Sequence, residues 1–67
     1  MLEDVYTLEQ WRKLRGLSQE ELAKKVNLST RTIWNYENDN NKLRSASYST
    51  IAKIAEVLSI KTQQIFL

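Results

Sequence analysis

Two helix starts set eleven residues apart constrain this chain more than any other feature. Ser18 is followed three residues later by Glu21, the spacing of a capping box in which each side chain bonds the backbone N–H of the other. Ser29 offers a second helix-capping hydroxyl after a short Asn27-Leu28 break. The spacing leaves room for one short helix, a tight turn and a second helix.

The two predicted helices span about 18–26 and about 29–38. A tight turn between two short helices is typical of a helix-turn-helix, in which the second helix can be presented end-on to a groove of DNA. We therefore treat the predicted helix over 29–38 as a candidate recognition helix.

The rest of the chain also favours helices. It has no proline and one glycine, and its apolar residues recur at intervals of three and four, so we predict an all-α, compact, five-helix fold. The first helix is expected to begin after Thr7, with Gln10 completing a capping box, and to end at Gly16. Its expected apolar stripe is Leu8, Trp11 and Leu14.

The second half of the chain is predicted to contain one long loop and two helices. Residues 38–47 are polar and rich in turn formers, so we expect a loop there. The fourth helix is expected to begin near Ser47 or Ser49, and a final helical turn to lie around Gln63 and Gln64. The residues expected to point inward after the first helix are Leu22, Ala23, Val26, Leu28, Ile33, Tyr36, Ile51, Ile54, Ala55, Leu58, Ile60, Ile65 and Phe66.

Length and composition exclude several classes of protein. Sixty-seven residues form at most one domain, expected to span 1–67, with little room for a catalytic cleft. The absence of cysteine and histidine removes thiolate and imidazole metal ligands and the commonest general base. No apolar run approaches the roughly 18 residues of a membrane span, and the acidic start is unlike a signal peptide. We expect a cytoplasmic protein that is not an enzyme and has no metal site, cofactor or membrane partner.

The distribution of charge is more informative than its total. The net charge is only +2. Residues 1–10 carry three acids and no base, whereas residues 11–31 carry six bases and two acids. Positive charge is therefore concentrated around the paired helices, as a nucleic-acid partner would require. The six bases are Arg12, Lys13, Arg15, Lys24, Lys25 and Arg31.

Four polar side chains are expected on the outer face of the third helix, because Ile33 and Tyr36 occupy its inner face. They are Thr30, Arg31, Thr32 and Asn35. In a major groove, an arginine can bond guanine O6 and N7 together, and an asparagine can bond adenine N6 and N7. The alternative interpretation is a helix face that water solvates and nothing more.

The sequence resembles the lambda-repressor-like, or XRE-type, helix-turn-helix family over nearly its whole length. The matching residues are Arg12, Gly16 to Ala23, Val26 to Ser29, Thr32-Ile33, Tyr36 to Asn38, Ile51, Ile54-Ala55 and Leu58 to Ile60. The resemblance implies base contacts by Thr30, Arg31, Thr32 and Asn35, with Thr32 nearest the backbone. It implies phosphate contacts by Gln19, Asn38, Lys42 and Arg44. Helix-start solvation of Gln19 and a solvated charged loop at Lys42 and Arg44 are the alternatives.

The same resemblance pairs Arg12 with Glu37 in a structural ion pair. Two positions depart from the family pattern. Trp34 stands where a small or polar residue is usual, and its ring either packs on the helix pair or reaches the sugar-phosphate backbone. No glycine follows Asn38, so an asparagine is expected to provide any left-handed helix stop.

The function that the resemblance implies is sequence-specific binding of double-stranded DNA by a transcriptional regulator, most often a repressor. The expected target is a near-palindromic operator bound by a homodimer, because one such domain contacts only a half-site. One alternative is a protein-interaction module, such as an antitoxin that regulates its own promoter. A second alternative is a helical bundle with a purely structural role.

Overall fold

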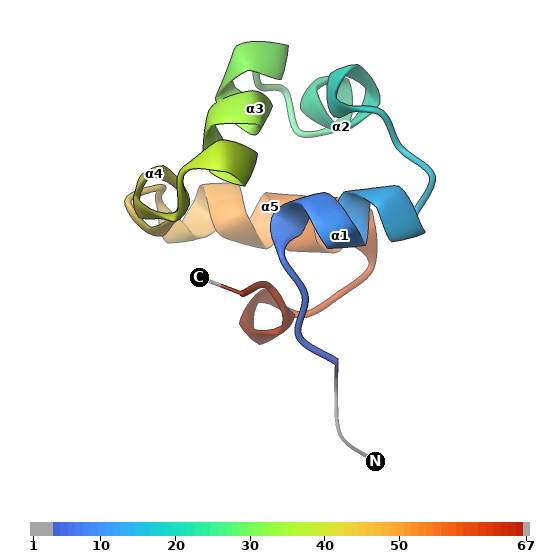
Figure 1. The fold of residues 1–67 in the computed structure, drawn as a ribbon, viewed down its shortest axis with the longest axis vertical. Helices are drawn as coiled ribbons and strands as arrows, with labels where there is room; N and C mark the ends of the chain where they lie inside the picture. The colour runs from blue at the N-terminus through green and yellow to red at the C-terminus, as the bar shows by residue number, and fades with distance from the viewer. Residues whose placement is uncertain (1–3, 67) are drawn as a thin grey trace.

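The computed structural model describes residues 4–66, and helices joined by short turns make up most of this range (Figure 1). The helices are α1 (Leu8–Leu14), α2 (Gln19–Lys25), α3 (Thr30–Asn38), α4 (Asn40–Arg44) and α5 (Tyr48–Leu58), followed by the 3-10 turn η1 (Thr62–Gln64). Within residues 4–66, the only β-type pairing is an isolated parallel bridge between Tyr6 and Ile65. The all-α prediction is confirmed, and the fold has five α-helices; α4 was not among the predicted helices, and the predicted final helical turn is η1.

The helix starts lie where the sequence placed them. Thr7 and Gln10 form a capping box with N···O distances of 2.9 and 3.2 Å. Ser18 and Glu21 form a second capping box at 2.8 and 3.0 Å. Gly16 follows α1 with a φ of +71°, a left-handed conformation that glycine adopts without strain. These side chains satisfy backbone donors that the first turn of a helix leaves unpaired.

The turn between α2 and α3 depends on a left-handed asparagine. Asn27 has a φ of 59°, a region that asparagine tolerates better than most residues. The N–H of Leu28 then returns to the carbonyl of Ala23 at 2.9 Å, which closes the end of α2. Ser29 caps α3 by accepting the Thr32 N–H at 3.0 Å. The turn thus fixes the direction in which α3 leaves α2.

The prediction of one long loop over 38–47 is wrong, because this segment contains α4. Asp39 has extended backbone angles, with φ −145° and ψ 101°. Its N–H donates to the carbonyl of Asn35 at 2.9 Å, and its carboxylate accepts the N–H of Asn41 at 3.0 Å. One residue therefore ends α3 and begins α4, and no left-handed stop is formed there. Leu43, only 1% exposed, anchors α4 in the core.

A single cluster of apolar side chains joins the helices. Its buried members are Leu8, Trp11, Leu22, Ala23, Val26, Ile33, Leu43, Ile51, Ile54, Ala55, Leu58 and Ile65. Leu28, Tyr36 and Ile60 are partly buried against it, as expected. Two expectations are wrong, because Leu14 and Phe66 are exposed. Leu67 lies outside the described residues.

The two ends of the described chain lie side by side next to α1, and hydrogen bonds join them. The Trp11 indole N–H donates to the carbonyl of Gln64 at 2.8 Å, and the Trp11 ring meets Tyr6 edge-on at 5.0 Å. Backbone hydrogen bonds from Tyr6 to Gln64 and from Phe66 to Tyr6 complete the contact. In Figure 1 this junction lies at the lower end of the molecule and α3 at the upper end, which leaves α3 clear of both chain ends.

Candidate nucleic-acid interface

The predicted ion pair is present and holds α3 against α1. The Arg12 Nε atom lies 2.6 Å from Glu37 Oε2, and a second guanidinium nitrogen lies 3.2 Å from Oε1. The two side chains are 10% and 2% exposed. Arg12 also donates to the carbonyl of Leu17 at 2.8 Å, just before the cap of α2. Arg12 therefore connects the first helix, the entry to the second and the end of the third.

Gln19 joins this buried pair. Its amide nitrogen donates to Glu37 Oε1 at 3.0 Å, so the carboxylate has partners on both oxygens. This bond holds the partly buried Gln19 side chain at the start of α2 and beside the end of α3. The amide oxygen and the second amide hydrogen remain able to bond another group.

The outer face of α3 presents the side chains that the sequence singled out. Thr30 and Arg31 are exposed in the first turn, and Asn35 is half-buried one turn later. Ile33 is fully buried on the opposite side of the helix. Thr32 differs from the other candidates, because its hydroxyl lies 2.8 Å from the Ser29 hydroxyl within the helix cap. Thr30, Arg31 and Asn35 are therefore the side chains that this face leaves available.

Trp34 lies beside Arg31 on α3, and sequence reasoning did not pair them. The Arg31 guanidinium carbon is 4.6 Å from the centroid of the Trp34 ring, within the range of a cation–π contact. Trp34 remains 43% exposed. Both expectations for the ring, packing on the helix pair and reaching the sugar-phosphate backbone, are compatible with this partial exposure. Arg31 and Trp34 are three residues apart, a spacing that places two side chains next to each other on a helix, so the contact could have been predicted from the sequence.

The other predicted phosphate contacts lie beyond the base-facing turn. The Asn38 amide donates to the carbonyl of Trp34 at 2.8 Å, which stabilises the last turn of α3. Lys42 and Arg44 are exposed on α4, which begins two residues after α3 ends. These two cations are thus carried by a helix rather than by a loop, in a fixed position relative to α3.

Comparison with known protein families gave a match to the helix-turn-helix model over residues 8–65. This range covers all of the helices and most of the chain. The chain belongs to the lambda-repressor-like helix-turn-helix family. Searches of curated proteins and of solved structures gave no match. As a member of this family, the protein is a DNA-binding regulator in general terms.

Not every base near the helix-turn-helix is free to contact DNA. Arg12 is buried in its ion pair, and Lys13 pairs with Glu9 at 3.1 Å. Arg15 donates to the carbonyl of Leu58 at 2.6 Å, at the end of α5, and lies 5.4 Å from the Trp11 ring centroid. The charge count along the sequence could not separate these bases from Arg31. Arg12 and Arg15 bond within the fold, whereas Arg31 is exposed on α3.

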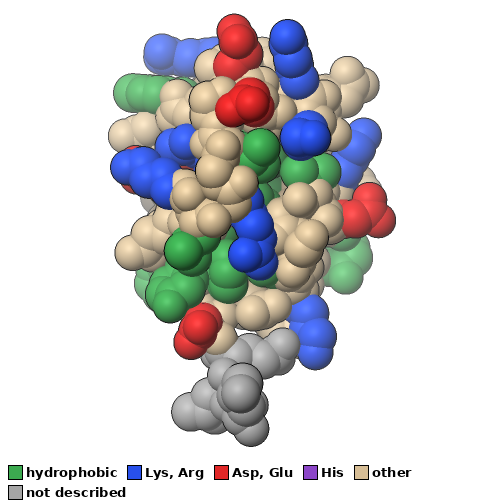
Figure 2. All heavy atoms as spheres, turned by 90° about the vertical axis from the view of Figure 1, so that its right-hand side faces the viewer, with side chains coloured by type: hydrophobic (Ala, Val, Ile, Leu, Met, Phe, Trp, Pro, Cys, Tyr) green, Lys and Arg blue, Asp and Glu red, His purple; other side chains and the backbone are tan. Residues whose placement is uncertain are grey.

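The side of the domain on which α2 lies carries mixed charge. Figure 2 shows acidic and basic side chains next to one another on this face, with apolar side chains between them. Two acidic residues, Glu20 and the capping-box residue Glu21, belong to the first turn of α2. The face in this view carries no uniform positive surface, so the candidate interface is limited to α3, α4 and the start of α2 with Gln19.

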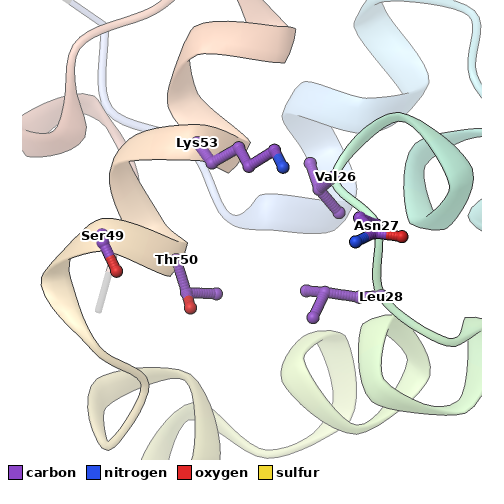
Figure 3. A pocket seen from close by; sticks show the side chains of 6 residues that line it. All are labelled: Val26, Asn27, Leu28, Ser49, Thr50 and Lys53. Carbon is purple, nitrogen blue, oxygen red and sulfur yellow. The ribbon is translucent and has the colours of Figure 1, made fainter.

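A shallow hollow of about 260 Å³ lies where the turn before α3 meets the first turns of α5 (Figure 3). Its lining residues are Val26, Asn27, Leu28, Ser49, Thr50 and Lys53. None of them belongs to the outer face of α3.

Among residues 4–66, no three His, Cys, Asp or Glu side chains are grouped as a metal would need. None of the helices in this range has the length and apolar character required to cross a membrane.

Proposed function

We propose that this domain reads a specific sequence in double-stranded DNA by placing the N-terminal half of α3 in the major groove, and that it acts as a repressor. The observation that carries the proposal is the outward position of Thr30, Arg31 and Asn35 on a helix whose far end is held by a buried ion pair. A recognition helix must be held rigidly if its side chains are to distinguish bases.

Each proposed reader has chemistry suited to a base edge. Arg31 can donate two hydrogen bonds to guanine, and Asn35 can both donate to and accept from adenine. Thr30 offers a hydroxyl and a methyl group at the start of the helix. Thr32 remains a proposed base contact nearer the backbone, although the cap already uses its hydroxyl.

The proposed phosphate contacts surround these readers. They are Gln19, Asn38, Lys42 and Arg44. Contacts of this kind set the register of a protein on the duplex without selecting a sequence. Gln19 is the best supported of them, because its bond to Glu37 fixes the amide group beside α3 while leaving donor and acceptor capacity free.

We further propose that two copies bind one operator. A single module of this size covers only a half-site, and two recognition helices would lie about 34 Å apart on successive major-groove faces of a near-palindrome. Repression would follow from occupying a site that polymerase or another regulator needs. This requires no catalytic group and no cofactor.

The test is selection of bound sequences from random duplexes, followed by salt titration of the selected site. We expect an enriched half-site repeated with near two-fold symmetry, and an affinity that falls steeply as salt rises, because phosphate contacts release counterions. A random duplex of equal length is the matched control. Equal affinity for both duplexes, or capture of a partner protein without any DNA binding, would contradict the proposal.

A further inference from the structure

Trp34 is the largest exposed apolar side chain of the recognition helix, and it lies outside the apolar core. The residue is 43% exposed and is absent from the apolar cluster and from the partly buried side chains around it. Among the described residues, its indole N–H donates no hydrogen bond, in contrast to the indole of Trp11. The cation–π partner of Trp34 within residues 4–66 is Arg31.

The contact constrains a side chain that is otherwise free. Arg31 is exposed and forms no ion pair with any residue in the range 4–66. A long arginine side chain loses considerable rotamer freedom when it is fixed against a base. With the guanidinium 4.6 Å from the ring centroid, Trp34 removes part of that freedom before DNA arrives.

Stacking does not consume the donors of Arg31. A cation–π contact uses the face of the guanidinium plane, whereas its N–H groups lie at the edge and stay available. Two adjacent N–H groups on a plane of fixed orientation match the two acceptors O6 and N7 of guanine. An unstacked arginine could instead bond phosphate, which carries no sequence information.

We propose that Trp34 is a positioning residue that orients Arg31 for guanine, and that it sets the strength of the guanine preference at the base contacted by Arg31. This inference rests on the proposed function. Trp34 acts through Arg31 rather than by reading a base itself, so the preference for adenine at the Asn35 contact is independent of the ring.

The first experiment is a double-mutant cycle on the selected duplex and on the same duplex with that guanine replaced. Trp34→Leu removes the aromatic face, Trp34→Phe keeps one, and Arg31→Ala removes the stacked group. We expect Trp34→Leu to lower discrimination for guanine by about two- to fivefold, the range of an exposed cation–π contact, and Trp34→Phe to restore most of it. In the Arg31→Ala background, Trp34→Leu should change nothing further.

A matched cycle between Trp34→Leu and Lys42→Ala serves as the control, because Lys42 lies on α4 and makes no contact with the ring. The two effects should be additive. Coupling as strong as that with Arg31 would show a general disturbance of the fold and would overturn the proposal. Unchanged or improved guanine discrimination in Trp34→Leu would overturn it as well, since the ring would then hold Arg31 away from the base.

The second experiment needs no DNA. In the free protein, the Arg31 side-chain protons next to the guanidinium should show upfield NMR shifts from the Trp34 ring current, and Trp34→Leu should abolish them while Trp34→Phe retains them. Absence of these shifts would refute the stack itself. If the shifts are present but the protein shows no base preference, the proposed function has failed and the positioning role of Trp34 fails with it.

Discussion

Two arginines of this domain differ in almost every respect except residue type. Arg12 is buried, and its guanidinium donates to Glu37 and to the carbonyl of Leu17. Arg31 is exposed and rests on the face of Trp34 with its donors unpaired. The first holds the recognition helix in place, and the second is proposed to read what the helix meets. Counting bases along a sequence gives both the same weight, although only the second adds positive charge to the interface.

The comparison predicts opposite consequences for the same substitution. Removing Arg12 leaves a buried carboxylate without its cation, which is costly because water cannot replace the lost partner. Removing Arg31 leaves nothing buried and unpaired, so the fold should not respond. Stability and sequence discrimination should therefore be affected by different arginines.

The largest expected effect is that of Arg12→Ala. We expect the free energy of unfolding to fall by about 3–5 kcal/mol, because Glu37 and the carbonyl of Leu17 each lose a donor. In a chain of this size such a loss approaches the whole stability, so the variant should be largely unfolded at 25 °C. Circular dichroism during thermal and urea denaturation measures it.

The paired replacement Arg12→Met with Glu37→Leu is the control. Exchanging both charges for apolar groups of similar size removes the uncompensated charge, so the double variant should be more stable than Arg12→Ala. Equal melting temperatures for Arg12→Ala and the parent protein would show that the pair does not hold the helices.

The next effect is on DNA recognition. Arg31→Ala and Asn35→Ala should each lose about 1–3 kcal/mol of binding free energy on the preferred duplex and lose discrimination at one base. Their melting temperatures should stay close to that of the parent, because neither side chain forms a hydrogen bond or ion pair with another residue in the range 4–66. Fluorescence anisotropy on matched and single-base-altered duplexes checks both variants. Full discrimination by both would contradict the assignment of readers.

Local patterns in the sequence predicted the helix starts well and the small polar helix poorly. Capping boxes at Thr7 and Ser18 involve residues three apart, so they are visible in sequence, and both are present. Helix α4 has five residues and a single buried anchor, Leu43, so no apolar periodicity could reveal it. Its formation depends on Asp39 serving two helices at once, a contact that only the folded chain defines.

The two wrong burial predictions have simple geometric causes. Leu14 lies six residues after Leu8, and because each helical residue turns by about 100°, the two side chains point about 120° apart. Phe66 directly follows the buried Ile65 in an extended segment, where neighbouring side chains point to opposite faces. The outward position of Thr30, Arg31 and Asn35 was predictable from helical periodicity. The hydrogen bond from Gln19 to Glu37 joins residues 18 apart in the sequence, and no local pattern predicts it.

A smaller effect separates phosphate contacts from base contacts. Lys42→Ala should weaken binding to all duplexes alike and reduce the slope of log affinity against log salt by about 1, since one phosphate contact is lost. The salt dependence of binding for Lys42→Ala and Arg31→Ala, measured on specific and random duplexes, compares the two classes directly. A change in base preference for Lys42→Ala would contradict its assignment to phosphate.

The smallest effect concerns an exposed carboxylate, in contrast to the buried Glu37. The backbone N–H of Ser18, followed by its hydroxyl, lowers the pKa of Glu21. A lowered pKa in the folded state adds stability above the unfolded value of about 4.3, and this stability is lost as pH falls through the folded value. Glu21→Gln should therefore have a slightly lower urea midpoint than the parent at pH 7. The difference between the two urea midpoints should disappear in strongly acidic buffer. A difference that grew on acidification would contradict a lowered pKa of Glu21 in the folded state.

The most direct test of the division between the two arginines is to follow the Nε–H NMR signals of Arg12, Arg15, Arg31 and Arg44 while the selected duplex is added. We expect the Arg31 signal to move most and that of Arg44 to move less. The signals of Arg12 and Arg15 should keep their free-state positions, because both guanidinium groups are bonded inside the fold. Movement of Arg12 or Arg15 with a stationary Arg31 would place the DNA on another face and contradict the proposed role of α3.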